Sequence, residues 1–149
     1  MKGFLASLLL ITAVAAHAEV KATAKLQLPK SATIGKAFTA TVVVTIPEGW
    51  HAYQNPPTKD FQVPVTISTK SKSLVIKKVS YPKGMMKEFA GELTAVLEGT
   101  VKIPVSVVMT GKPGAGAVDM NLLIQICDQN SCLRPAIVAV KGSLKLVKG

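Results

Sequence analysis

Apolar and polar residues alternate with a period of two along most of this chain after its first 18 residues. The stretch VKATAKLQL places five apolar side chains on one face, namely Val20, Ala22, Ala24, Leu26 and Leu28. Runs rich in Val, Ile, Leu and Thr follow at residues 37–46, 63–69, 74–81, 92–99, 101–110, 120–126 and 136–147. Turn residues separate these runs, and no run sustains the helical period of 3.6 residues. The pattern predicts an all-β fold, an immunoglobulin-like β-sandwich of about seven to nine short strands.

Prolines and glycines predict where the strands are interrupted. Pro64 and Pro104 fall inside strand-like runs, and we expect them at sheet edges or bulges because proline cannot donate a ladder hydrogen bond. The stretch GKPGAGA (111–117) predicts a seven-residue hairpin loop rather than a linker between domains. Because we find no internal repeat either, we expect residues 19–149 to form a single domain.

The first 18 residues have the pattern of a cleaved signal peptide. Lys2 precedes the apolar stretch FLASLLLITAVA, and Ala16 and Ala18 occupy the small-residue positions of a cleavage site. A retained membrane anchor is the alternative. With cleavage after Ala18, the mature chain is exported and starts at Glu19. No other apolar stretch of about 18 residues follows, so we expect no integral membrane protein after cleavage.

Basic residues dominate the charge. The chain has 18 Lys and Arg against 8 Asp and Glu, a formal net charge of +10 that becomes +9 without Lys2. An anionic surface or an acidic partner would suit this excess. The lysines are scattered rather than interleaved with aromatic residues, which indicates an ordinary solvated surface. Together with export, this scatter argues against nucleic acid as a partner.

Few residues are available for catalysis or metal binding. The mature chain has a single histidine, His51, and no nucleophile elbow or phosphate-binding loop. A zinc site would have to be assembled from Cys127, Cys132, His51 and a carboxylate such as Asp128. A copper(I) site could recruit thioethers, which are offered by Met85, Met86, Met109 and Met120. We expect neither a metal nor an organic cofactor, and metal handling stays as a minor alternative.

The two cysteines are the strongest chemical feature. Cys127 and Cys132 have four residues between them and lie between two strand-like runs, and in an exported protein a disulfide is their default state. As a staple, such a short loop would stabilise the fold by only about 2 kcal/mol. As a switch, it would be accessible to an attacking thiolate. Spacing alone leaves both interpretations open.

Two aromatic segments accompany the cysteines. In PEGWHAYQNPP (47–57), a strand would place His51 and Tyr53 on one face and Trp50 on the other. In GMMKEFAGEL (84–93), Phe89 lies in a predicted loop between Gly84 and Gly91. Phe89 could plug the core, or it could cover a reactive site as a movable lid.

Taken in order, GWHAY, KEFAGE and CDQNSCLRP resemble the N-terminal periplasmic domain of the DsbD thiol–disulfide interchange proteins, over residues 20 to 147. The resemblance implies an immunoglobulin-like sandwich in the bacterial periplasm that takes electrons from a thioredoxin-like partner and passes them to exported oxidoreductases. It implies that Cys127 and Cys132 cycle between disulfide and dithiol. It also assigns Phe89 and Glu88 to a cap over the sulfurs, and His51 and Tyr53 to the lining of the site.

Two departures from the family pattern suggest a more cationic site. His51 stands where a tyrosine is common, and Lys87 stands where an acidic residue often precedes Glu88, changes that would favour thiolate.

The resemblance also sets the expected partners. The chain lacks the family's transmembrane and thioredoxin segments, so we expect a monomeric thiol–disulfide oxidoreductase supplied by a thioredoxin-fold protein or a membrane thiol reductase. We expect Cys127 to be the attacked sulfur and Cys132 the less accessible one. A non-catalytic binding module with a structural disulfide is the alternative function.

Overall fold

The computed structural model describes residues 18–149, which form strands, turns and loops. The predicted signal peptide therefore lies outside the described residues, except for Ala18. Within the described part of the chain, no helix is long and apolar enough to cross a membrane. Twelve strands assemble into three four-stranded sheets.

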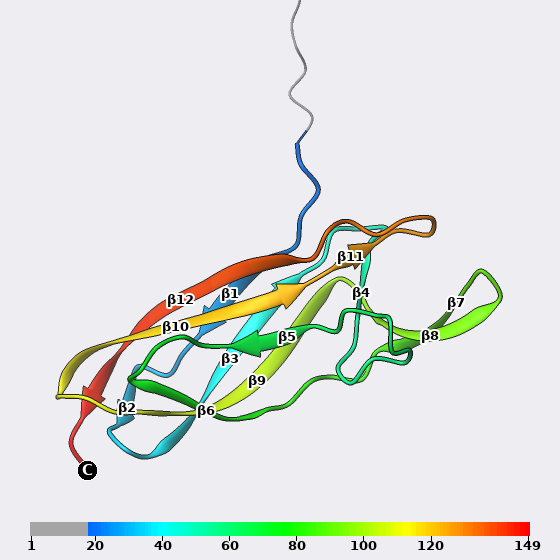
Figure 1. Ribbon diagram of the computed structural model, residues 1–149. Helices are drawn as coiled ribbons and strands as arrows, with labels where there is room; N and C mark the ends of the chain where they lie inside the picture. Colours follow the sequence, from blue (N-terminus) through cyan, green and yellow to red (C-terminus); the bar gives the residue numbers. More distant parts are fainter. Residues whose placement is uncertain (1–17) are drawn as a thin grey trace, which may run out of the picture.

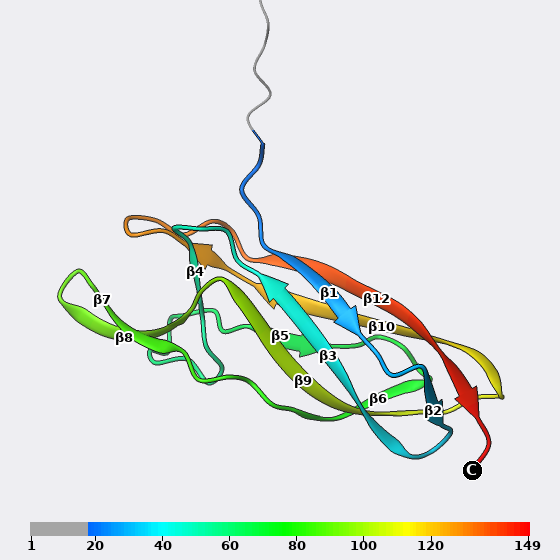
Figure 2. The same ribbon diagram turned by 180° about the vertical axis from the view of Figure 1, so that it is seen from behind.

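Two of the sheets form the body of the molecule (Figures 1 and 2). The first sheet is antiparallel and has the order β1-β3-β9-β6, with bounds Thr23–Gln27, Ala37–Thr45, Thr100–Met109 and Leu74–Val79. The second sheet has the order β2-β12-β10-β5, with bounds Ser31–Thr33, Ala136–Val147, Gly114–Ile124 and Thr66–Ser68. Only β2 runs parallel to its neighbour there. The expected all-β, immunoglobulin-like sandwich is confirmed.

The core lies between these two sheets and follows from the alternation. Every second residue of β9 is buried, and so is every second residue of β10 from Gly116 onward. The largest fully buried side chains come mainly from β3, β9, β10 and β12: Val42, Val44, Ile103, Val105, Val107, Met109, Val118, Met120, Leu122 and Val140. Burial of this kind contributes roughly 1.5–3 kcal/mol for each large apolar side chain. The sandwich thus has a substantial core that owes nothing to the cysteines.

The third sheet lies at one end of the sandwich, opposite the C-terminus (Figure 1). Its order is β11-β4-β8-β7, with bounds Ile126–Cys127, His51–Tyr53, Glu92–Leu97 and Met85–Phe89. Its strands are antiparallel. β11 follows β10 after a single residue, Gln125. The body sheet therefore delivers Cys127 directly to this end of the molecule.

The predicted loop at residues 111–117 is shorter than expected. β10 already begins at Gly114, and residues 114–117 pair with β12. A Cβ on Gly116 would lie 2.7 Å from Cγ of Leu146. This glycine therefore makes room for the side chain of Leu146 on the neighbouring strand β12, whereas the sequence pattern suggested a turn.

Pro104 does not mark an edge, because it lies in the central strand β9. Its carbonyl accepts a hydrogen bond from the backbone N–H of Ser80, on the side where β6 has just ended at Val79. A strand residue directs its N–H and C=O to the same neighbour in an antiparallel pair. Pro104 lacks a backbone N–H on the side where β6 has already ended, so no β6 residue loses a hydrogen-bond donor there.

Candidate functional site

The two cysteines form a disulfide at the sandwich end. Cys127 ends β11 and pairs in register with His51 of β4. The chain then turns through residues 128–131 and returns to Cys132, which forms an isolated antiparallel bridge with Cys127. The S–S distance is 1.99 Å. The short loop predicted from the spacing is therefore present and closed.

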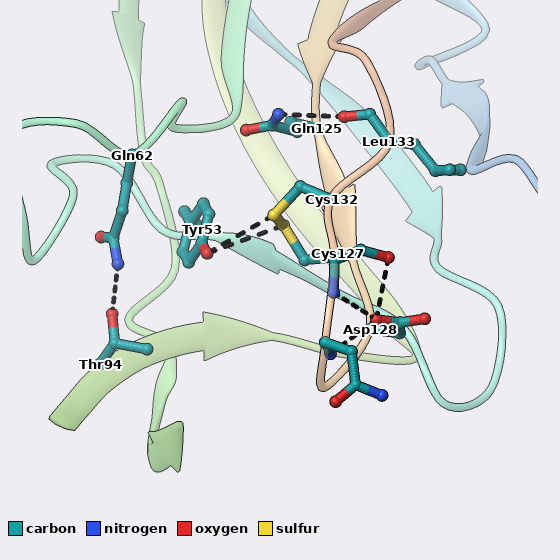
Figure 3. Close-up of a disulfide and its surroundings, with 10 residues drawn as sticks. Tyr53, Gln62, Thr94, Gln125, Cys127, Asp128, Cys132 and Leu133 are labelled. Atoms are coloured by element: carbon teal, nitrogen blue, oxygen red, sulfur yellow. Dashed lines mark hydrogen bonds between the residues drawn. A yellow bond between two sulfur atoms is a disulfide. The ribbon is translucent and has the colours of Figure 1, made fainter. Parts of the chain in front are cut away.

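Asp128 holds the turn between the cysteines (Figure 3). Its Oδ1 accepts hydrogen bonds from the backbone N–H groups of Asn130 (2.8 Å) and Ser131 (2.7 Å). These hydrogen bonds lower the pKa of the Asp128 carboxyl below its usual value, and the bond from Asn130 contributes most. Asp128 was considered only as a fourth zinc ligand from the sequence. Its carboxylate instead fixes the loop that presents Cys132.

The two cysteine residues differ sharply in exposure. Cys127 is 2% exposed, whereas Cys132 lies on the surface. The expectation that Cys132 is the less accessible cysteine is therefore wrong. The physical reason is pairing: Cys127 is held in β11 against β4, while Cys132 lies beyond the turn at the outer side of the loop.

Tyr53 faces both sulfurs, as Figure 3 shows. Its hydroxyl oxygen lies 3.7 Å from Sγ of Cys127 and 3.9 Å from Sγ of Cys132. Disulfide sulfurs carry no proton, so the hydroxyl is the donor. Burial raises the pKa of the Tyr53 hydroxyl above its usual value, which keeps this donor protonated. Tyr53 is thus placed to stabilise a thiolate formed at either sulfur.

His51 lies between Tyr53 and Phe89. Its ring centroid is 5.7 Å from that of Tyr53, edge to face, and 4.4 Å from that of Phe89. The side chain is 4% exposed. Burial, aided by the charge of Lys87, lowers the pKa of His51 below its usual value, although Glu98 and Asp128 oppose this shift. Burial therefore favours the neutral imidazole at pH 7.

Two features of the structure oppose the expected cationic character of the site. Burial disfavours a charge on His51, and Nζ of Lys87 lies 2.7 Å from both carboxylate oxygens of Glu98. Glu98 follows the end of β8, eleven residues away, and was not identified from the sequence. Only the pairing of β7 with β8 brings these two residues together.

We predict that His51 makes the folded protein sensitive to mild acid. Because the pKa of His51 is lower in the folded state than the usual 6.5, the unfolded chain binds more protons between these two values. The free energy of unfolding should therefore fall as the pH drops from 6.5 through that window. Above pH 6.5 both states are neutral at this residue, and it contributes no pH dependence.

Urea denaturation at a series of pH values, compared between wild type and His51→Phe, measures this contribution. In the variant, the free energy of unfolding should not begin to fall near pH 6.5. It should still fall at lower pH, where the carboxylates titrate. Parallel pH profiles for the two proteins would contradict the prediction.

Phe89 and Glu88 lie on a β-hairpin rather than in the loop expected from the sequence. Phe89 ends β7 and pairs with Glu92 of β8, and only Ala90 and Gly91 lie between them. Both turn residues have positive φ angles, 50° and 81°, which is the conformation that tight hairpins require. The side chain of Phe89 contacts His51, and that of Glu88 is exposed. The core-plug interpretation of Phe89 is wrong, because it lies outside the core cluster.

A recess of about 820 Å³ lies between this hairpin and the cysteine loop. Its wall consists of residues 46–51, 87–90, 98–99 and 129–130. The sequence pointed to three of these residues, His51, Glu88 and Phe89, as members of a site. The sequence did not identify the carboxylates of Glu48 and Glu98, which lie on two separate turns.

The metal alternative finds no support in the geometry. Among residues 18–149, no three His, Cys, Asp or Glu side chains form a group that could hold a metal ion. The four methionines considered for copper are also divided: Met109 and Met120 are buried in the core, whereas Met85 and Met86 are exposed on β7.

Fold and site together define a β-sandwich that carries a partly exposed disulfide at one end. The family model for the N-terminal domain of the thiol:disulfide interchange protein DsbD matches residues 12–141. The chain therefore belongs to this family of thiol–disulfide interchange domains. Among curated proteins, none matches the chain.

Two solved structures illustrate the likeness. The N-terminal periplasmic domain of ScsB from Proteus mirabilis superimposes with a TM-score of 0.56 at 16% identity, covering 80% of this chain and 43% of that structure. This chain thus spans less than half of that structure, and the likeness shows a shared fold. The reduced N-terminal domain of DsbD from Neisseria meningitidis gives a TM-score of 0.47 at 13% identity, covering 71% of this chain and 80% of that domain.

Proposed function

We propose that the protein is an exported periplasmic domain that relays electrons by thiol–disulfide exchange through Cys127 and Cys132. The observation that carries this proposal is the asymmetric pair: an exposed sulfur bonded to a buried one, with the hydroxyl of Tyr53 facing both. The disulfide closes a short loop outside the core cluster, where it contributes little to the stability of the fold. Family membership supports the same chemistry.

The exchange proceeds in two balanced steps. A donor thiolate attacks Sγ of Cys132, the S–S bond breaks, and Cys127 leaves as a thiolate that accepts a hydrogen bond from Tyr53. A second donor thiolate then attacks the mixed disulfide at the donor's own sulfur and releases Cys132. Two electrons have entered the domain, and protonation of the thiolates completes the dithiol. The reverse sequence, with Cys132 attacking, reduces an acceptor disulfide.

The partners in this proposal are thioredoxin-fold proteins of the periplasm, and a membrane thiol reductase is the alternative source of electrons. The domain, residues 19–149, acts as a monomer after removal of the signal peptide. Phe89 and Glu88, at the tip of the β7–β8 hairpin, form a cap beside the disulfide. The contact of Phe89 with His51, and of Tyr53 with the sulfurs, supports this cap.

Equilibration of the folded protein with thiol redox buffers tests the proposed function. We expect the disulfide to be reduced while the β-sheet circular dichroism is retained, with a reduction potential above about −300 mV. Structural disulfides fall below that value. A lower potential, or reduction only in denaturant, would show that the disulfide is structural.

A further inference from the structure

The recess beside the disulfide is acidic, although the chain as a whole is strongly basic. Its wall carries the carboxylates of Glu48, Glu88 and Glu98 against one cation, Lys87. Lys87 is engaged by Glu98. Within the described part of the chain, neither Glu48 nor Glu88 forms an ion pair, and both are exposed. In a chain with 18 basic and 8 acidic residues, the wall of this recess therefore has the opposite sign to the net charge of the chain.

His51 provides a second, independent feature of the same recess. Its side chain is 4% exposed and lines the cavity. Among residues 18–149, no hydrogen bond is made to its ring nitrogens, and no polar side-chain atom fully removed from solvent lacks a partner. The ring nitrogens of His51 therefore keep some contact with solvent, and the recess is the cavity whose wall His51 forms. A neutral imidazole offers one acceptor nitrogen, and burial lowers the pKa of His51, which preserves that acceptor.

The remaining walls suit the stem of a long cationic side chain. Phe89 and Trp50 contribute aromatic surface to the cavity. Lys and Arg stems bury against apolar surface while their charged ends remain near polar groups, and an aromatic face attracts the cation itself. The cavity adjoins the disulfide, because Gln129 and Asn130 of its wall belong to the loop that Cys127 and Cys132 close.

We infer that this recess is the docking site for a basic side chain, Arg or Lys, that the exchange partner carries beside its reactive cysteine. Glu48 and Glu88 supply the attraction, and His51 accepts a hydrogen bond from the bound guanidinium or ammonium group. The inference rests on the proposed exchange function and adds the chemistry of the partner. A cation beside the cysteine of the partner is chemically reasonable, since it favours the thiolate that must attack.

Two five-residue peptides test the inference, one with arginine and one with glutamate on each side of a central cysteine. The second-order rate of exchange with the oxidised protein is measured at low ionic strength and at 1 M salt. Comparing protein variants with the same peptide cancels differences in the chemistry of the peptide thiol. Each carboxylate removed should lower the rate of exchange with the arginine peptide about fivefold at low salt, and 1 M salt should remove this difference between the proteins.

The variant Glu48→Gln/Glu88→Gln removes the two unpaired carboxylates, and Asp119→Asn is the control. Asp119 is a surface carboxylate on β10, away from the recess. We expect the double variant to slow the arginine peptide and accelerate the glutamate peptide, and Asp119→Asn to do neither. Equal rates for wild type and the double variant would overturn the inference while leaving the exchange function intact.

A binding measurement separates docking from exchange. Trp50 is the only tryptophan of the chain and lines the recess, so its fluorescence reports occupancy. The arginine peptide with serine in place of cysteine should change this fluorescence in wild type, and should bind at least about tenfold more weakly to the double variant. His51→Phe should weaken it too.

The remaining outcomes are equally decisive. If the disulfide is inert to both thiol peptides while the serine peptide binds in this pattern, the exchange function fails and the basic-side-chain site stands. Equal binding of the arginine and glutamate serine peptides would overturn the site. Self-association at low salt that is lost in the double variant, measured by sedimentation, would assign the recess to a lysine of a second copy and overturn the partner assignment.

Discussion

A Cys127→Ser variant should form a stable mixed disulfide with a thioredoxin-fold protein or with glutathione disulfide, whereas Cys132→Ser should not. The first variant leaves the exposed thiol of Cys132, which a disulfide can approach directly. The second leaves Cys127, which is 2% exposed and reacts only when the loop or β11 opens. Local opening that costs about 3 kcal/mol slows its reaction roughly 100-fold.

The measurement is the rate of modification of each single-cysteine variant by an aromatic disulfide reagent in folded protein. The same rates in 6 M urea provide the control, because both thiols should then react alike. Equal rates in the folded state would contradict the assignment of Cys132 as the attacked sulfur. A faster reaction of Cys127 would restore the order expected from the sequence.

The body of the sandwich is predictable from sequence because its strands follow local alternation. The run at 136–147 coincides with β12, and residues 37–46 differ from β3 by one residue. In both strands a two-residue period separates the buried face from the exposed face, and this period needs no knowledge of the partner strand. The core residues of β9, such as Ile103 and Val105, follow from the same rule.

The third sheet is less predictable because it depends on pairings between distant segments. β4 and β11 have three and two residues, too short for a periodic signal. The hairpin that carries Phe89 turns at Ala90 and Gly91, and alanine at a positive φ is not a recognised turn residue. Sequence reasoning therefore selected Phe89 and Glu88 but assigned them to a loop.

The accessibility of the cysteines was mispredicted, and the structure opposes the expected charge of the site, for the same reason. Cys127 is buried because β4 pairs with it, 76 residues away along the chain, and nothing in CDQNSC records that pairing. Burial against Phe89 and the surrounding structure lowers the pKa of His51 and so favours its neutral form. Residue identity alone suggested added positive charge, whereas the fold removes one cation by burial and engages the other, Lys87, with Glu98.

Gly84→Ala should loosen the hairpin and expose the disulfide to faster exchange. A Cβ on Gly84 would lie 2.7 Å from the backbone N and O of Val96, so the start of the hairpin must shift. Val96 is fully buried and pairs with Tyr53 of β4, which transmits the shift to the residue facing the sulfurs. Overpacking of this kind destabilises the fold by about 1–3 kcal/mol.

The shift should also weaken the contact between Phe89 and His51. An aromatic pair contributes about 0.5–1.5 kcal/mol, so its loss should accelerate exchange with glutathione roughly two- to tenfold if Phe89 caps the disulfide. Gly35→Ala is the matched control. Gly35 has φ +77° and open space around it. It belongs to the turn between β2 and β3, which lies at the opposite end of the sandwich from the third sheet (Figure 1), and alanine there should cost about 1–2 kcal/mol through backbone strain.

Stopped-flow exchange kinetics and urea denaturation of the two variants together decide the matter. Both should lose comparable stability, but only Gly84→Ala should exchange faster. An equal acceleration in Gly35→Ala would mean that exchange follows global stability, and the hairpin would then have no capping role. An unchanged rate in Gly84→Ala, despite lost stability, would show that Cys132 is accessible without any movement of Phe89.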